Sequence, residues 1–240
     1  MQHRSIDVNI PIGDAGMGGH LAVPATAPRG AIVVIQEIFG VTPAMRAIAD
    51  DFASQGYIAL VPDIYWRLQP NLDLGNGEDP TMRQLAVDYS IRFDEELGTQ
   101  DLVAAADWLK SFLELPYQPA VLGFCLGGRM AVRVAAAARF SCMVSMYGVG
   151  LDKMGAQIHS ASCPVQFHFG ENDNHNPLTT IETVREATRT RGRTSDEFYT
   201  YPGAEHAFYN RFRLDRFNEA AHQIARERIV RFLAHHMLGA

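Results

Sequence analysis

Short apolar runs that alternate with helical patterns are the feature of this sequence that most restricts its fold. A run that is apolar throughout, such as "AIVVIQ" at 31–36, is typical of a strand buried on both faces of a parallel sheet. Five further runs have strand character: "YIALVPD", "QPAVLGF", "FSCMVSMYG", "CPVQFHFG" and "DEFYTYPG". Parallel strands need crossover connections, and the segments between these runs are long enough to supply them.

Helical periodicity occupies several of those connections. The predicted helices cover Thr42 to Gln55, a segment starting near Thr81, Leu126 to Arg139, Pro177 to Thr190, and Leu214 to His236. We therefore predict an α/β fold with a mostly parallel central sheet and helices on both faces. No repeat, low-complexity tract or linker interrupts the chain, so residues 1–240 are expected to form one domain. In such a fold, ligands bind at the carboxyl ends of the strands.

The charge balance and the hydropathy pattern exclude several classes of partner. The chain has 21 Lys and Arg against 27 Asp and Glu, a net charge of −6, so we expect no nucleic-acid partner. The longest aliphatic run, 31–35, is far shorter than the roughly 20 residues of a membrane helix, and the polar segment 1–10 does not resemble a signal peptide. The sequence thus predicts a cytoplasmic protein without a membrane partner, which we take to be a monomer.

The three cysteines, Cys125, Cys142 and Cys163, show neither paired spacing nor metal-ligand spacing. Their pattern fits a reducing compartment, and no metal or other cofactor is expected. Another segment, "QPNLDLGNGEDP" from Gln69 to Pro80, is rich in turn-forming residues. It is interpreted either as a solvated connector or as a lid or specificity loop.

The stretch "GFCLGG" contains the strongest chemical signal. Gly123 and Gly127 flank Cys125 where a strand must reverse sharply into a helix, which is the context of a nucleophile elbow. The helix amino end favours a thiolate, and the N–H of Leu126 is available to an oxyanion. The alternative is a small buried structural cysteine, the role that we assign to Cys142 and Cys163.

Two later turns supply partners for a nucleophile. Asp173 follows the strand of "VQFHFGENDNHNP", and His206 follows the strand of "FYTYPGAEHAF". The order nucleophile, acid, histidine is that of α/β-hydrolases, in which the acid orients the imidazole and the imidazole exchanges protons with the nucleophile. Other acids and histidines compete for these roles: Glu171, His175, Glu205, His159, His168, His235 and His236.

A further carboxylate, Glu37, follows Gln36 at the end of the buried strand 31–36. A glutamate there is costly unless it is paired or lies in a site. We expect Glu37 to lie near Cys125 and the N–H of Ile38 to be the second oxyanion donor. The alternative is a solvent-facing glutamate at the strand end.

Together these residues resemble the dienelactone hydrolase (carboxymethylenebutenolidase) family of the α/β-hydrolase superfamily. The resemblance rests on "QEIFGVTPAMR", "GYIALVPDIYWR", "GFCLGG", "MYGVGLDK" and the turns of Asp173 and His206, in family order. It implies the α/β-hydrolase fold and a triad of Cys125, Asp173 and His206. It also implies that Glu37 pairs with the resting thiol and takes its proton when a substrate carboxylate arrives.

The family acts on a carboxylated enol lactone formed during chlorinated-aromatic degradation, so the resemblance implies a small anionic lactone or ester as substrate. Arg83 lies at one of two positions where the family binds the carboxylate; the other is Asn210 here, with Arg211 next to it. The pocket departs from the family at Val87, Ser90 and Ala207.

We therefore predict a cofactor-independent carboxylic ester hydrolase that opens a small lactone or ester through a cysteine acyl-enzyme. One alternative is a broad-specificity carboxylesterase of the same fold that does not require a carboxylate. Another is a noncatalytic member that binds small molecules or senses redox state through its thiol.

Overall fold

Eight strands form one sheet in the computed structural model, which describes residues 3–237. In chain order they are β1 (Arg4–Ile12), β2 (Ala15–Val23), β3 (Gly30–Ile35), β4 (Tyr57–Pro62), β5 (Ala120–Phe124), β6 (Met143–Met146), β7 (Val165–Gly170) and β8 (Glu197–Tyr201). Their order in the sheet is β1-β2-β4-β3-β5-β6-β7-β8. The six strands from β3 onward pair in parallel, which confirms the mostly parallel sheet.

The two amino-terminal strands form an antiparallel hairpin that the sequence reading did not predict. β1 pairs with β2, and β2 pairs antiparallel with β4 at the sheet edge. Ile12 pairs with Ala15, so the loop has two residues, and Gly13 adopts the positive φ, 57°, that such tight hairpins need. The hairpin extends the sheet beyond its parallel part.

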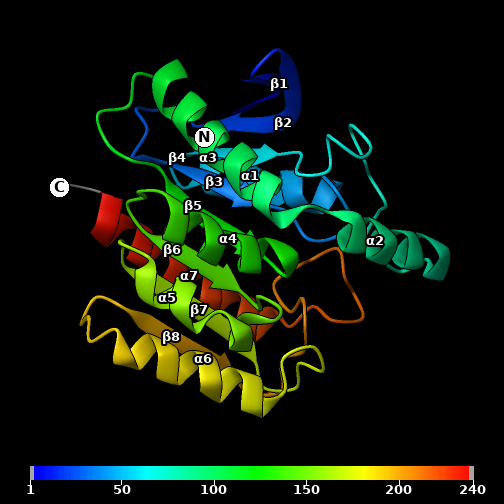
Figure 1. Ribbon diagram of the computed structural model, residues 1–240, viewed down its shortest axis with the longest axis vertical. Helices are drawn as coiled ribbons and strands as arrows, with labels where there is room; N and C mark the ends of the chain where they lie inside the picture. Colours follow the sequence, from blue (N-terminus) through cyan, green and yellow to red (C-terminus); the bar gives the residue numbers. More distant parts are fainter. Residues whose placement is uncertain (1–2, 238–240) are drawn as a thin grey trace.

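Helices cover both faces of the sheet, as predicted (Figure 1). They are α1 (Pro43–Ser54), α2 (Pro80–Arg92), α3 (Glu95–Phe112), α4 (Leu126–Ala137), α5 (Gly155–Ser160), α6 (Leu178–Thr190) and α7 (Glu219–Met237), with a short 3₁₀ helix at Leu151–Lys153. Phe52 of α1 and Ile229 of α7 belong to one hydrophobic cluster. Leu102 of α3, Met130 of α4 and Ile181 of α6 belong to the cluster on the opposite face.

Two of the long helices differ from prediction. The last helix begins at Glu219 rather than Leu214, because Asn218 caps it: the Oδ1 atom of Asn218 accepts from the N–H of Ala221 at 3.0 Å. The long helix α3 was not predicted at all. None of the helices within residues 3–237 has the length and apolar character needed to cross a bilayer.

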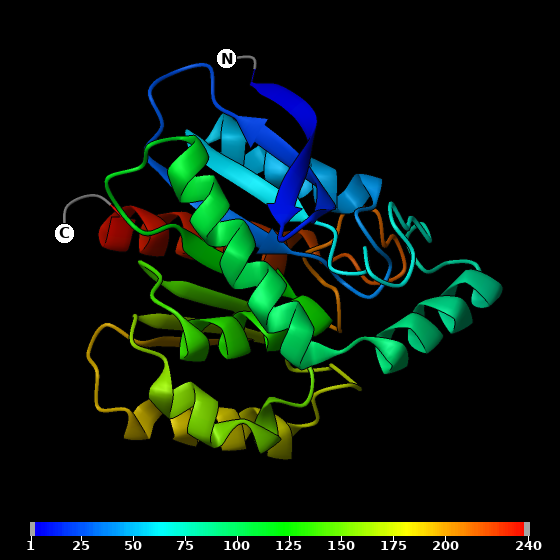
Figure 2. The same cartoon turned by 45° about the horizontal axis from the view of Figure 1, so that its top comes forward.

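The helix α2 projects from the body of the molecule beside the carboxyl ends of the strands (Figures 1 and 2). Leu72 and Leu74, in the loop before α2, are buried, and the N–H of Leu74 donates to the carbonyl of Phe39 at 2.9 Å. Farther along that loop, the amide of Asn76 donates to the carbonyl of Phe212 at 2.9 Å. The segment 69–80 is therefore packed against two other loops and is not merely a solvated connector.

Candidate active site

The sharp turn between β5 and α4 carries Cys125. Its backbone has φ of 56° and ψ of −115°, a region that residues with side chains rarely adopt. Flanking hydrogen bonds hold this conformation: the N–H of Cys125 donates to Met146, and its carbonyl accepts from Arg129. The side chain thus sits at the N-cap of α4, partly exposed, above the unpaired N–H groups of the helix.

The glycines around Cys125 are required by close backbone contacts. A Cβ atom at Gly123 would lie 1.9 Å from the carbonyl oxygen of Gly127, and one at Gly127 would lie 2.3 Å from the carbonyl oxygen of Ile35. Both contacts are far inside van der Waals distance and involve backbone, which cannot move aside. Gly123 and Gly127 are therefore required because a side chain at either position would clash with the backbone of the turn, as the sequence indicated.

Asp173 and His206 meet across the loops that follow β7 and β8. The Oδ2 atom of Asp173 lies 2.8 Å from Nδ1 of His206. The same carboxylate accepts from the Asn176 side chain at 2.9 Å and from the N–H groups of His175 and Asn176. Because Asp173 is saturated with donors, Nδ1 of His206 carries a proton, and Nε2 is the atom left to exchange one.

His206 faces Cys125 in the same cavity, and its Nε2 atom is buried without a hydrogen-bond partner among the described residues. Burial disfavours the imidazolium, but the negative charges of Cys125 and Asp173 outweigh it and raise the pKa of His206 to about 10. Burial also raises the pKa of Asp173, yet its bond to His206 prevails and lowers it below the usual range. These directions favour an imidazolium at His206 beside an ionised Asp173.

Two backbone amides next to the sulfur are unoccupied. Neither the N–H of Ile38 nor that of Leu126 donates to any group within residues 3–237. Both residues border the same site, Ile38 in the cavity wall and Leu126 in the first turn of α4. They are therefore free to donate to an oxyanion, the role expected from the sequence.

Glu37 is buried and lines the cavity of Cys125, as expected. Its hydrogen bonds, however, are not to the Cys125 thiol, as the family resemblance implied. Its Oε1 atom accepts from the hydroxyl of Tyr147 at 3.3 Å and its Oε2 atom from the amide of Asn210 at 2.9 Å. No hydrogen bond joins Glu37 to Cys125 within the described part of the chain. Burial raises the pKa of Glu37, against the opposing effects of His206, Asn210, Arg213 and Tyr147.

The cavity above these groups has a volume of about 140 Å³. Its lining residues are Glu37, Ile38, Phe39, Arg83, Val87, Cys125, His175, His206, Ala207, Arg213 and Arg216. The wall combines apolar side chains with three arginines. This composition fits a small, partly apolar ligand that carries negative charge.

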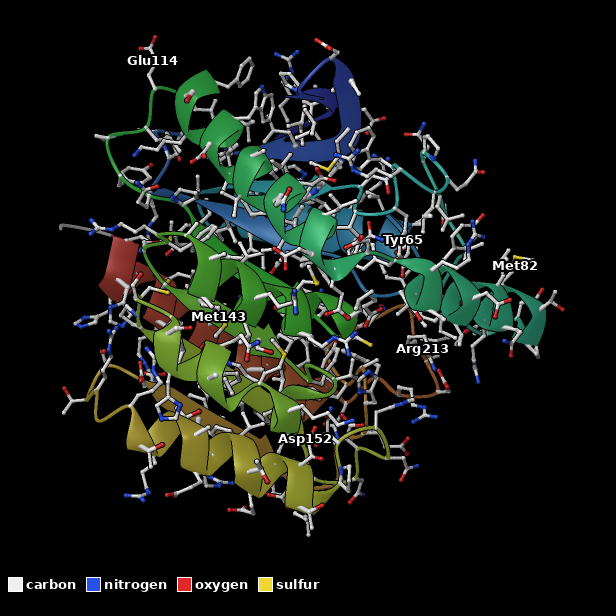
Figure 3. All side chains as sticks on the ribbon, viewed as in Figure 1. Tyr65, Met82, Glu114, Met143, Asp152 and Arg213 are labelled. Atoms are coloured by element: carbon white, nitrogen blue, oxygen red, sulfur yellow. The ribbon has the colours of Figure 1, made fainter. Side chains whose placement is uncertain are left out.

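Of the two arginines expected at the site, Arg83 lies in the cavity and Arg211 does not. Arg83 lies in the cavity wall, and its guanidinium donates to the carbonyl of Gly77. Arg211 does not line this cavity; it contacts His222 at 2.8 Å and borders a separate depression. Arg213 lines the cavity instead, in the loop between β8 and α7 on the side where α2 projects (Figure 3).

Asn210 also departs from the role expected for it. Its side chain is 2% exposed, is bonded to Glu37, and does not line the cavity. The departures Val87 and Ala207 do lie in the cavity wall, whereas the Ser90 hydroxyl donates to the carbonyl of Val87. The cavity positions that differ from the family pattern thus lie on α2 and on the His206 loop.

Sequence reasoning did not identify Tyr147, Asn176 or Arg213 as members of the site. The signals for the first two were present: Tyr147 directly follows β6 and Asn176 lies three residues after Asp173, both at carboxyl strand ends. Tyr147 also has a strained φ of 40°. Arg213 had no such signal, because it lies in an irregular loop whose path the sequence does not reveal.

Of the competing residues, His175 lines the cavity, with its ring centroid 4.5 Å from that of His206, whereas three others have partners elsewhere. Glu171 accepts from Thr200, Glu205 pairs with Arg216, and His168 is buried between Gln166 and Tyr201. Cys142 and Cys163 are buried, and burial raises the pKa of each thiol. No group of three or more His, Cys, Asp or Glu side chains within 3–237 has the arrangement of a metal site.

Comparison with known proteins was consistent with this geometry. The family model described as the dienelactone hydrolase family matches residues 17–237. Carboxymethylenebutenolidase 1 of Cupriavidus pinatubonensis is 33% identical over 218 residues, 90% of this chain and 91% of that protein. The carboxymethylenebutenolidase of Pseudomonas sp. strain P51 is 36% identical over 162 residues, 68% of each chain. A crystal structure from Klebsiella pneumoniae, assigned to the dienelactone hydrolases, superposes with a TM-score of 0.85 at 26% identity and covers 98% of this chain and 99% of its own.

Proposed function

Because the chain belongs to the dienelactone hydrolase family of hydrolases, we propose that it cleaves a small lactone or ester through a Cys125 acyl-enzyme. One observation carries the proposal: the Asp173–His206 pair, bonded at 2.8 Å, leaves Nε2 of His206 free in the cavity that contains Cys125. This is the arrangement that nucleophilic acyl transfer needs.

In the proposed mechanism, the Cys125 thiol gives its proton to Nε2 of His206 and its sulfur attacks the carbonyl carbon, while the amides of Ile38 and Leu126 stabilise the oxyanion. The ring or ester oxygen leaves and takes a proton from Nε2 of His206, which yields a thioester. His206 then removes a proton from water, which attacks the thioester; the C–S bond breaks, the acid leaves, and the sulfur takes the proton back from His206. Asp173 holds the imidazole in the required tautomer throughout.

We further propose that the substrate carries a carboxylate. Arg83 and Arg213 support this proposal because both line the cavity, and an added Cβ at Gly77, whose carbonyl binds Arg83, would lie 3.3 Å from Nη1 of Arg213. The guanidinium groups of Arg83 and Arg213 thus both lie near Gly77, and two such groups can bind one carboxylate by charge-assisted hydrogen bonds.

A broad-specificity carboxylesterase without a carboxylate requirement is the second candidate. It is favoured by the pairing of Arg213 and Arg216 with Asp215, because a guanidinium already neutralised attracts an anion less. Within the described residues, Arg83 is the cavity arginine without an acidic partner.

Two esters of the same leaving group, one with an acidic acyl chain and one with a neutral chain of equal length, distinguish the candidates. The carboxylate proposal predicts a higher kcat/KM for the acidic ester and a loss of about tenfold or more in Arg83→Gln, with little change for the neutral ester. Equal values for both esters would support the broad esterase.

The acyl-enzyme is tested separately with an activated ester and intact mass measurement. A mass increase equal to the acyl group is expected in the wild type and should be missing in Cys125→Ala. Turnover of a carboxylated enol lactone by Cys125→Ala at the wild-type rate would refute the mechanism.

A further inference from the structure

A second histidine, His175, lies in the wall of the Cys125 cavity and has no part in the triad. Its ring centroid is 4.5 Å from that of His206, with 58° between the two ring planes, so the two rings are in contact. Within residues 3–237, neither ring nitrogen of His175 forms a hydrogen bond with another side chain or with the backbone. Both nitrogens are therefore available to a ligand in the cavity.

The position of His175 is fixed by the loop that carries the triad acid. Its N–H donates to Oδ1 of Asp173 at 2.8 Å. The next residue, Asn176, is fully buried, and its side-chain amide donates to Oδ2 of Asp173 at 2.9 Å and to the carbonyl of Tyr147 at 3.3 Å. The backbone of His175 therefore cannot move away from His206 without breaking contacts of Asp173.

The contact with His206 places His175 beside the alcohol part of a bound substrate. In the proposed mechanism, Nε2 of His206 donates a proton to the leaving oxygen, so this oxygen and its substituents lie next to the His206 ring. In a lactone, the equivalent part is the ring carbon that bears the ring oxygen. His175 is exposed as well as cavity-lining, so it also borders the opening through which an alcohol leaves.

The surroundings of His175 keep its imidazole neutral. Burial is the main cause that lowers the pKa of His175, and the positive charges of His206, Arg216 and Arg213 add to it, against the opposing charge of Asp173. A neutral imidazole has one donor and one acceptor nitrogen, as a hydroxyl group also donates and accepts. This side of the cavity is thus suited to a neutral polar group.

We propose that His175 is a specificity residue that binds the alcohol part of the substrate, and that the preferred substrates are esters or lactones with a hydroxyl or similar neutral polar group near the leaving oxygen. The inference rests on the proposed function and extends it, because the carboxylate proposal concerns the acyl part. An aromatic ring without nitrogens at this position would fill the same space but could not form the hydrogen bond.

The test compares two esters of one acid, a hydroxyethyl ester and a propyl ester, which have the same number of heavy atoms. Each kcat/KM is divided by the rate constant for hydrolysis of that ester by hydroxide, which corrects for the different reactivity of the leaving groups. In the wild type we expect the corrected value to be about three- to tenfold higher for the hydroxyethyl ester, the gain expected from one hydrogen bond.

The variant His175→Phe keeps a ring against His206 and removes both nitrogens. Its corrected preference should fall to about one through a loss of kcat/KM for the hydroxyethyl ester, with the propyl ester changed by less than about twofold. His175→Gln should retain part of the preference, because its amide also donates and accepts. His159→Phe is the matched control and should behave as the wild type: His159 lies on α5 and bonds the carbonyl of Gly155 and the hydroxyl of Thr190.

A purely structural role for His175 would give a different result. Damage to the triad would lower kcat/KM for both esters alike and shift its pH dependence, because His206 is the proton donor. We expect the pH profile of His175→Phe on the propyl ester to follow that of the wild type.

Equal corrected values for the two esters in the wild type would overturn the inference, and so would a preference that survives in His175→Phe. In either case, turnover of both esters would leave the proposed hydrolase function intact. Failure of that function is recognised by other results: no acyl group on Cys125 and no turnover of either ester or of an enol lactone, in which case the inference falls with it.

Discussion

Backbone strain marks the chemistry at the scale of single residues. Within residues 3–237, five residues other than glycine have positive φ, and Cys125, Tyr147 and Ala207 of these lie at the candidate site. Each such conformation costs of order 1–3 kcal/mol and persists only where surrounding contacts enforce it. The strain at Cys125 was predictable from its glycines; the strain at Tyr147 was not, because no neighbouring glycine pattern marks it.

A first prediction concerns Gly123. Gly123→Ala should lower the free energy of unfolding by about 2–4 kcal/mol and abolish most hydrolysis, because the added Cβ would lie 1.9 Å from the carbonyl oxygen of Gly127. Denaturant unfolding and kcat measure the two effects. Gly192→Ala is a control for the loss of a glycine. An added Cβ at Gly192 would meet no atom within 4 Å, so this variant should lose only the stability that its φ of 68° costs a residue with a side chain. Normal activity in Gly123→Ala would show that the turn can relax.

A second prediction concerns the pH dependence of activity. The pKa of His206 is raised to about 10, so the imidazolium that donates to the leaving oxygen persists across neutral pH. Activity should therefore be present below that value and be lost as the pH rises through about 10. The measurement is kcat/KM against pH on a substrate stable to base, corrected for spontaneous hydrolysis. A decline centred near the ordinary histidine pKa of about 6.5 would contradict the close pairing with Cys125.

At the scale of elements, the sequence predicted best the strands that are buried on both faces of the sheet, because such strands have a nearly continuous apolar pattern. β3, β4, β5 and β7 are buried along their whole length and were predicted within a few residues. The hairpin was missed because β1 is an edge strand with alternating exposure and β2 contains three glycines. The start of α7 was missed because Asn218 was not recognised as its cap.

A third prediction concerns α2, which carries Arg83 and Val87. Its N-cap is Asp79, whose carboxylate accepts from the N–H groups of Thr81 at 2.7 Å and Met82 at 3.4 Å. Asp79→Ala should cost about 1 kcal/mol of stability. It should also raise KM for an acidic ester several-fold, because the first turn of α2 holds Arg83.

Thermal unfolding and kinetics on acidic and neutral esters measure these effects. Asp79→Asn is the matched control, since its Oδ1 atom can still cap the helix. An equal rise in KM for both esters would show that α2 shapes the pocket without orienting a charge.

At the scale of the whole molecule, the topology explains why part of the site could be predicted. Cys125, Asp173 and His206 follow strands whose carboxyl ends meet at one edge of a parallel sheet, so chain order alone places them together. Arg213 and Asn210 lie in the irregular loop between β8 and α7, and local sequence does not determine its path. The expectation for Arg211 failed there: a shift of two residues brings Arg213 into the cavity.

A last prediction follows because the protein is negatively charged as a whole but its cavity is lined by arginines. The protein carries a net charge of −6 and repels an anionic substrate at long range, whereas the cavity presents Arg83, Arg213 and Arg216. Salt screens charges beyond about 10 Å at 0.1 M, so it weakens the dispersed surface charge first. The arginines act at contact distance, and their attraction is the larger effect on binding if the substrate carries a carboxylate.

We therefore expect kcat/KM for an acidic ester to rise slightly at low salt additions and then to fall by about threefold or more toward 0.5 M, while the neutral ester stays nearly constant. Arg83→Gln should flatten the falling part of the curve. A steady rise with salt for the acidic ester would mean that the net charge dominates and that the cavity arginines do not bind the substrate carboxylate, which would favour the broad esterase.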